Sequence, residues 1–151
     1  MNIITYPNGY LRSISKEVSL PLQEEDKKLL NELFQYVKEE SDSAVGLSAV
    51  QVGVAKRMCA IRFKIGDKTV AYKLVNPKII SHSQKKVCDV EGCLSVQQEH
   101  ANVPRWESVK VYAYDAITNK YVVINARGFE ARVLQHEIDH MDGKLYIDYL
   151  Q

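Results

Sequence analysis

The stretch LQHEIDHMDG, residues 134–143, is the strongest indication of how this chain folds. It holds His136 and His140 four positions apart, with Glu137 directly after the first histidine. On a helix, residues four apart share one face with β-carbons about 5 to 6 Å apart, so both imidazoles can reach one cation. Glu137 can then approach a water molecule there as general base and later as general acid. The stretch predicts a helix that carries a metal site.

A second interpretation of the same stretch stays open, in which the two histidines are ordinary solvated or core residues. The chain has only four histidines, and two of them fall in this stretch. The apolar residues Leu134, Ile138 and Met141 surround them and would turn the helix towards a core. A bare HExxH pattern does not decide between a metal site and two structural histidines.

The third protein ligand that a catalytic site of this type needs is not found downstream. In one protease pattern a third histidine follows six residues after the second, but Tyr146 occupies that position here. In another pattern a later glutamate is the ligand, and the stretch MDGKLYIDYLQ contains none. The ordinary metalloprotease interpretation therefore fails at this ligand, which has to come from upstream.

Five upstream residues could be that ligand. Cys59 lies in the strand-like run MCAIRFKI and is expected to be a small buried side chain, and Cys88 has a similar strand context. His82 and His100 are isolated in polar stretches and are expected at the surface. Cys93 differs because EGCLSV places it after a glycine, where a strand is predicted to end and the backbone can turn close to another group.

Outside this region the patterns predict one mixed domain. Apolar residues recur on one helical face between residues 24 and 41, and residues 128–141 return to helical character. Strands are predicted by the runs MCAIRFKI, TVAYKLVNP, KKVCDV, SVKVYAYD and KYVVINA, with hairpin turns at Gly66-Asp67 and AITN. We expect a single α+β domain over residues 1–151, with mainly antiparallel sheets and an N-terminal helix.

The composition excludes several classes of protein. Apolar residues make up 46% and charged residues 26% of the 151 residues, which is typical of a globular chain and not of a disordered or membrane-spanning one. The net charge of +1, without a long basic cluster, argues against direct nucleic-acid binding. The chain has three cysteines and shows no signal-peptide pattern at its N-terminus. Both observations favour a protein of the reducing cytoplasm.

Three motifs in order resemble the peptide deformylase family. They are AVGLSAVQ at residues 44–51, EGCLS at residues 91–95 and QHEIDH at residues 135–140. The segments YPNGYLR, NPKI, VPRWESVKV and GKLYIDYL also look like family sequence, so the resemblance covers nearly the whole chain. It implies mainly antiparallel sheets packed around a central HExxH helix, and a cytoplasmic enzyme that removes the formyl group from N-formylmethionyl nascent peptides, releasing formate.

The resemblance also implies roles for individual residues. By position, Cys93, His136 and His140 would hold one divalent metal with water as the fourth ligand, and Glu137 would carry the proton. The metal implied in the cell is Fe2+, while purified protein could carry Zn2+, Ni2+ or Co2+. The Gln51 side-chain amide and the Leu94 backbone N–H match positions that stabilise an oxyanion. The residue types alone do not choose among these metals.

Further positions match the peptide-binding part of the family. The backbone at Val45, Gly46 and Gly92 would hold an extended peptide as an added strand, and Phe129 and Val133 would line the methionine side-chain pocket. For Phe129 and Val133, ordinary core packing is an equally good interpretation. Glu91 is expected to be structural and to pair with Arg105. A transient contact with the ribosome is left open, and no membrane partner is expected.

The chain departs from the family pattern at several positions near these motifs. They are Ala44, Ser48 and Val50 in the first motif, Gln97 and Gln98 after the second, and Glu130 before the third. These departures keep two other hypotheses open. One is a divergent paralogue with a binding or regulatory role, and the other is a metallopeptidase of different specificity.

Overall fold

The computed structural model describes residues 1–150 and leaves the side chains of Gln98 and Glu99 undescribed. The long elements are the helices α1 (Glu24–Glu39) and α2 (Phe129–Met141) and the strands β1 (Gly46–Ser48), β2 (Met58–Ile65), β3 (Lys68–His82), β4 (Lys86–Cys93), β5 (Val96–Trp106), β6 (Ser108–Asp115) and β7 (Lys120–Arg127). Short 3-10 turns are η1 (Gly9–Arg12), η2 (Ala49–Val52) and η3 (Tyr146–Tyr149). The expected fold class is confirmed.

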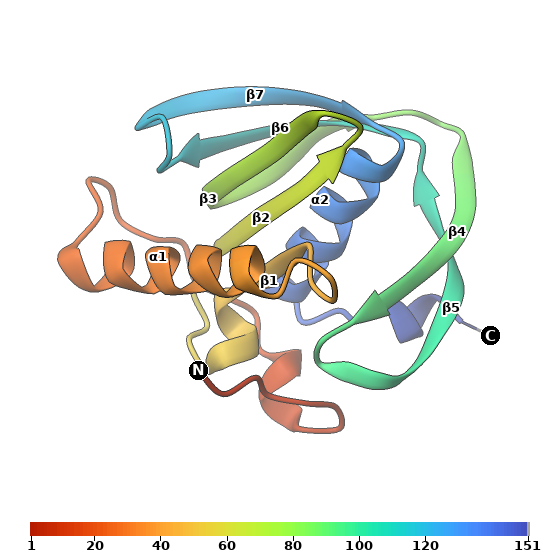
Figure 1. The fold of residues 1–151 in the computed structure, drawn as a ribbon, viewed down its shortest axis with the longest axis horizontal. Coiled ribbons are helices and arrows are strands. Elements are labelled where there is room, and N and C mark those ends of the chain that lie inside the picture. Colours follow the sequence, from red (N-terminus) through yellow and green to blue (C-terminus); the bar gives the residue numbers. More distant parts are fainter. Residues whose placement is uncertain (151) are drawn as a thin grey trace.

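The strands form two antiparallel sheets (Figure 1). Five strands pair in the order β1-β2-β3-β6-β7, while β4 and β5 make a separate two-stranded ribbon. The helix α2 lies between the larger sheet and this ribbon, and α1 crosses the other face of the larger sheet (Figure 1). The HExxH helix is therefore central, as the resemblance implied.

The apolar run of β2 explains why a helix covers each face of the larger sheet. Side chains alternate between the two faces of a strand. Met58 and Ala60 pack with α1 residues such as Leu33, whereas Cys59 and Ile61 pack in a second cluster with residues of α2. A strand buried on both faces reads as a continuous apolar run, which is the pattern of MCAI at residues 58–61.

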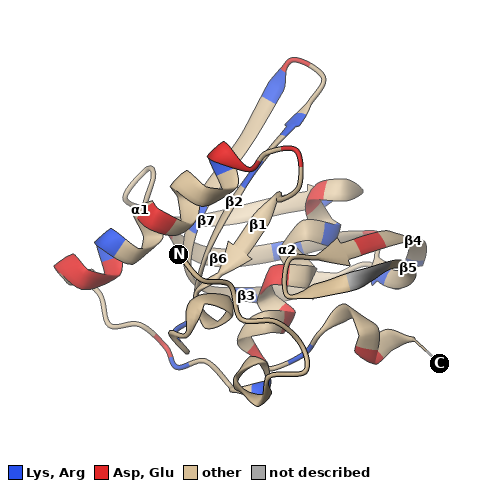
Figure 2. Cartoon of the chain, turned by 60° about the horizontal axis from the view of Figure 1, so that its bottom comes forward, with Lys and Arg blue, Asp and Glu red and all other residues tan. Residues whose placement is uncertain are grey.

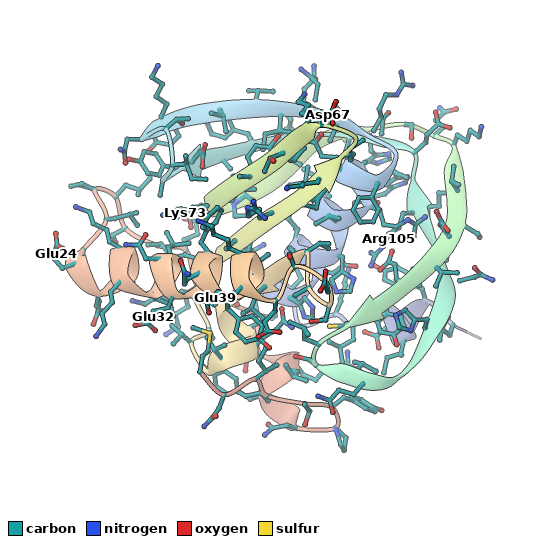
Figure 3. The ribbon with its side chains drawn as sticks, viewed as in Figure 1. Glu24, Glu32, Glu39, Asp67, Lys73 and Arg105 are labelled. Atoms are coloured by element: carbon teal, nitrogen blue, oxygen red, sulfur yellow. The ribbon has the colours of Figure 1, made fainter. Side chains whose placement is uncertain are left out.

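The outer face of α1 carries charged residues. Glu24 and Glu32 extend from this face away from the sheet (Figure 3), and both are exposed. Acidic and basic residues are interspersed along the whole chain (Figure 2), as expected from the nearly balanced composition. Among the described residues, no helix is both long enough and apolar enough to cross a membrane.

Several boundaries differ from the sequence-based expectations. The first helix ends at Glu39 and not at residue 41, and β3 runs on to His82 through two irregularities in its pairing with β6. The strands β1 and β5 were not expected, because β1 has three residues and β5 is polar and contains Pro104. The hairpin turn between β2 and β3 is confirmed, and Gly66 adopts the positive φ of +59° that the turn requires.

Candidate metal centre

The two histidines of the HExxH stretch come together on one face of α2, as the spacing predicts. Their ring centroids are 4.9 Å apart, and the two Nε2 atoms are 3.2 Å apart. His140 is fully buried and His136 is largely so. The part of the alternative interpretation that made them solvated residues is therefore wrong.

Cys93 brings the third donor atom to the same point. It is the last residue of β4, directly after an irregularity in the pairing of β4 with β5. Its Sγ lies 3.4 Å from His140 Nε2, and the ligand atoms of Cys93, His136 and His140 all lie within 4.8 Å of one another. In a tetrahedral site with metal–N near 2.0 Å and metal–S near 2.3 Å, donors stand roughly 3.3 to 3.6 Å apart. The three residues thus fit one divalent metal ion.

The other two cysteines lie outside this cluster. Cys59 is buried in the core between β2 and α2, and burial raises the pKa of its thiol well above the usual range. Cys88 is exposed on β4, so the expectation of a buried strand position for this residue is wrong. The ribbon is covered on only part of its surface, which leaves Cys88 facing solvent. His82 and His100 are exposed, as expected.

Glu91 orients His136 from behind. Its carboxylate accepts hydrogen bonds from His136 Nδ1 at 2.8 Å, from Arg105 Nε at 2.8 Å and from Arg132 Nη1 at 2.6 Å. Burial alone would raise the pKa of Glu91, but the bonds from Arg105 and His136 lower it to about 2. The carboxylate stays charged and favours a proton on His136 Nδ1, which would leave the Nε2 lone pair to bind a metal ion. The expected pairing of Glu91 with Arg105 is confirmed.

Arg105 extends this network to the end of the chain. Its Nη1 donates to Asp139, which also accepts a hydrogen bond from the hydroxyl of Tyr149 at 2.7 Å. The guanidinium lies between α2 and the ribbon (Figure 3) and is almost fully buried. The charges that flank the histidines are therefore paired and hydrogen-bonded, as buried charges need to be.

Glu137 lies beside the metal cluster in a buried position. Its Oε1 accepts a hydrogen bond from Ser48 Oγ at 2.9 Å. Burial raises the pKa of this carboxyl group, and the neighbouring His136 and the Ser48 hydroxyl oppose that shift. An ideal β-carbon on Gly46 would lie 2.6 Å from Glu137 Oε2, so only glycine fits at that position without displacing the carboxylate.

Gln51 and Leu94 reach the same place from two other segments. Gln51 Nε2 donates to Ser95 Oγ at 3.0 Å and lies 3.8 Å from Cys93 Sγ, while its Oε1 accepts from the Ser48 backbone N–H at 3.0 Å. Leu94 follows Cys93 and lines the adjoining cavity. A side-chain amide and a peptide group therefore flank the sulfur atom.

A cavity of about 220 Å³ opens next to these groups. It is bordered by all five residues assigned to peptide binding, which are Val45, Gly46, Gly92, Phe129 and Val133. Val133 is buried, whereas the Phe129 ring is about half exposed and meets Phe63 edge-on at 5.0 Å. A larger hollow of about 890 Å³ borders another face of α2 and touches none of the three metal-binding candidates. The smaller cavity is lined by Cys93, His136 and Glu137.

The departures from the family pattern have distinct environments. Glu130 accepts a hydrogen bond from the Tyr72 hydroxyl at 2.6 Å, and this bond joins α2 to β3 outside the cavity. Ala44 borders the cavity, Val50 is buried and Gln97 is exposed. The Gln98 side chain lies outside the described residues.

Two residues that contact the site were not predicted from the sequence to do so. Ser48 was noted only as a departure, although it contacts both Glu137 and Gln51. Arg132 was not noted, although it lies four residues before His136, and residues four apart share a helix face. That spacing was an available signal for Arg132, whereas nothing local indicates the partner of Ser48.

Comparisons with known proteins agree with this geometry. The sequence model of the family described as Polypeptide deformylase matches residues 1–151. The chain belongs to the peptide deformylase family. It is 37% identical to peptide deformylase 2 of Bacillus cereus, over 99% of this chain and 88% of that protein.

Solved deformylases share the fold. The Ehrlichia chaffeensis enzyme superposes with a TM-score of 0.91 at 33% identity, covering 100% of this chain and 88% of that one. The Acinetobacter baumannii enzyme, crystallised with Met-Ala-Ser bound, gives 0.90 at 28% identity, covering 99% and 98%. The resemblance drawn from the three motifs is confirmed, and the chain is a hydrolase that removes N-formyl groups.

Family membership and the cluster of Cys93, His136 and His140 together support a divalent metal in this protein. The family also implies formylated nascent peptides as substrates.

Proposed function

We propose that residues 1–151 act as one deformylase domain in the cytoplasm and hydrolyse the formyl amide of N-formylmethionyl peptides. The observation that carries this proposal is that Cys93 lies next to the two histidines of α2. Cys93 supplies the third ligand, which an ordinary metalloprotease takes from a residue downstream of the HExxH stretch. Contact with the ribosome would be transient, through the emerging peptide. The balanced charge argues against a nucleic-acid partner.

Cys93, His136 and His140 would hold the metal, which we propose is Fe2+ in the cell and can be replaced by Zn2+, Ni2+ or Co2+ in purified protein. One thiolate and two imidazoles suit each of these ions, so availability decides which is bound. When bound, the ion supplies a Lewis acid that polarises a carbonyl oxygen and lowers the pKa of water. Glu91 keeps the His136 ring oriented towards it.

The remaining chemistry is assigned to this chain's own side chains. Glu137 takes a proton from the attacking water as the new carbon–oxygen bond forms, and it delivers that proton to the amine nitrogen as the carbon–nitrogen bond breaks. Gln51 Nε2 and the Leu94 N–H donate to the oxygen of the formyl carbon while that carbon is tetrahedral. Removing one such donor typically costs about 100- to 1000-fold in rate.

The cavity would hold the start of the peptide. Backbone groups at Val45, Gly46 and Gly92 border the cavity from both sides, which supports binding of an extended strand between them. Phe129 and Val133 offer an apolar wall for the methionine side chain. The Acinetobacter baumannii relative was crystallised with Met-Ala-Ser bound, which supports a peptide that begins with methionine as the ligand of this cavity.

The test is formate release from a formyl-Met-Ala-Ser peptide by protein loaded anaerobically with Fe2+ and, in parallel, with Ni2+ or Co2+. We expect Glu137→Ala to reduce turnover by at least about 100-fold, because general acid–base catalysis contributes about that much or more. Glu130→Ala is the matched control, since it removes a carboxylate of the same helix outside the cavity and is expected to leave turnover unchanged.

Equal formate release by wild type and Glu137→Ala would contradict the proposal and favour a binding or regulatory paralogue. Cleavage of internal peptide bonds in an unformylated peptide would favour a metallopeptidase. Both outcomes are read from the same reaction mixtures by analysing the products.

A further inference from the structure

Ser48 links the two segments that carry the assigned proton carrier and the assigned oxyanion donor. It is the last residue of β1 and is completely buried. Among the residues that the structure describes, its hydroxyl hydrogen-bonds to one residue of α2, Glu137. Serine is not required by the strand itself, since β1 pairs with β2 through backbone groups.

The hydroxyl of Ser48 can hold the Glu137 side chain in one rotamer. Ser48 Oγ lies 2.9 Å from Glu137 Oε1 and 3.1 Å from the Glu137 backbone oxygen. Hydrogen bonds to a charged acceptor are roughly twice as strong as neutral ones. The bond therefore opposes rotation of the carboxylate away from the cavity.

Gly46 closes the other side of the carboxylate. Glu137 Oε2 lies where a β-carbon of Gly46 would otherwise be, at 2.6 Å from its ideal position. One carboxylate oxygen is thus bonded to Ser48 and the other lies against the backbone of the same strand. The side chain is enclosed by two residues of β1 that are two positions apart and therefore share a strand face.

The backbone of Ser48 has a second, separate contact. Its N–H donates to Gln51 Oε1, which turns Gln51 Nε2 towards Cys93 and Ser95. Substitutions of the Ser48 side chain leave this N–H in place. The backbone contact with Gln51 is therefore kept when the side-chain contact with Glu137 is removed. Ser48 is also the N-cap residue of η2, so Ser48→Thr, which keeps a hydroxyl at the cap, controls for an effect on that turn.

We propose that Ser48 is a positioning residue that holds the Glu137 carboxylate in its productive orientation through the hydroxyl. The inference rests on the proposed function, since it adds a residue to that mechanism. Ser48 does not touch the reacting atoms in this assignment. Its effect should appear in turnover and not in peptide affinity or metal content.

The experiment compares Ser48→Ala, Ser48→Thr and Ser48→Cys in nickel-loaded protein. We expect Ser48→Ala to lower kcat about tenfold, while KM and bound nickel stay within about twofold, because misorientation of a catalytic group by about 1 Å costs up to 100-fold. Ser48→Thr keeps the hydroxyl and should restore most of kcat. Ser48→Cys has only a weak donor and should behave like Ser48→Ala.

Two further measurements separate positioning from packing. Ser15→Ala removes a buried hydroxyl that has no hydrogen-bond partner among the described residues, and it should change neither kcat nor KM. In urea denaturation, Ser48→Ala should shift the midpoint less in the Glu137→Ala background than in wild type, since interacting residues are non-additive.

If wild type releases formate, two results would overturn this inference while leaving the proposed function intact. One is a kcat of Ser48→Ala equal to that of wild type, and the other is an equal shift of the urea midpoint by Ser48→Ala in wild type and in Glu137→Ala. A loss that appears in KM or in bound nickel would also overturn it. Wild type that releases no formate would overturn both this inference and the proposed function.

Discussion

The three cysteines of this chain have the same side chain but lie in three different environments in the fold. Cys59 is packed among apolar side chains, Cys88 faces solvent and Cys93 meets two imidazoles. Thiolate character and access decide whether a cysteine binds metal. Cys59 is closed off from solvent and from ions, and Cys88 lies outside the group of His136 and His140. Of the three cysteines, Cys93 is therefore the one whose environment suits a metal ion.

We expect Cys93→Ala to lower the bound metal of anaerobically loaded protein from about one equivalent to well below one. Loss of one of three ligands removes both a donor and the charge that balances the ion. Cys59→Ala and Cys88→Ala should keep about one equivalent. Elemental analysis after gel filtration measures this, and unchanged metal in Cys93→Ala would remove that residue from the site.

At the scale of single residues, the motif positions were predictable and their partners were not. Spacing on a helix is enough to place His136 and His140 together. The hydrogen bond of Ser48 with Glu137 joins residues 89 positions apart, and no local pattern carries that information. The exposure of Cys88 was missed for a related reason, because it depends on which face of the ribbon the rest of the molecule covers.

At the scale of elements, Arg132 attaches α2 to both strands of the ribbon. Its Nη1 donates to Glu91 and to the Val103 backbone oxygen at 2.8 Å, and its Nη2 donates to the Val87 oxygen at 2.7 Å. Val87 belongs to β4 and Val103 to β5. Over residues 1–150, the ribbon shares no strand pairing with the larger sheet, so contacts of this kind hold it in place.

We expect Arg132→Met to lower the free energy of unfolding by about 3 kcal/mol. It leaves the backbone oxygens of Val87 and Val103 without this donor, and it removes one of the positive charges that offset the buried carboxylate of Glu91. The matched control is Arg127→Met, whose side chain is 80% exposed with one contact to Glu107 at 3.8 Å. It should change stability by less than about 0.5 kcal/mol. Urea denaturation monitors both, and equal effects would mean that the ribbon is held by packing alone.

The elements whose apolar residues recur at a regular spacing were predictable from the sequence. The two helices and the strands β2, β6 and β7 follow from apolar spacing, and their bounds agree to within two residues. The strand β5 was missed because polar residues and Pro104 interrupt the alternation. A strand in a two-stranded ribbon tolerates this, since its pairing depends on one neighbour and much of it faces solvent.

At the scale of the whole molecule, a bound metal would cross-link two separate parts of the fold. Cys93 ends the ribbon and His140 lies in α2, 47 positions along the chain. A ligand that binds only the folded state stabilises it by mass action, by about 2.7 kcal/mol at 100 times the dissociation constant. The metal would therefore serve both the chemistry and the attachment of the ribbon.

We expect removal of the metal by a chelator to lower the unfolding temperature by roughly 5 to 10 °C, given the usual scaling for a domain of this size. Differential scanning calorimetry of loaded and chelated protein measures the shift. Cys93→Ala should show little or no shift between the two conditions. A chelator-induced shift of equal size in wild type and Cys93→Ala would contradict a structural role for the ion.

The two strands that border the cavity are both sheet edges. Among the described strands, β1 ends the larger sheet and β4 pairs only with β5, so each has an edge without a partner strand, and residues of both border the cavity. Unpaired edges invite strands from other molecules and promote aggregation. Here β1 offers only three residues, which is too short a template for an intruding strand. The brevity of β1 therefore protects the protein's solubility while leaving room for the first residues of a peptide.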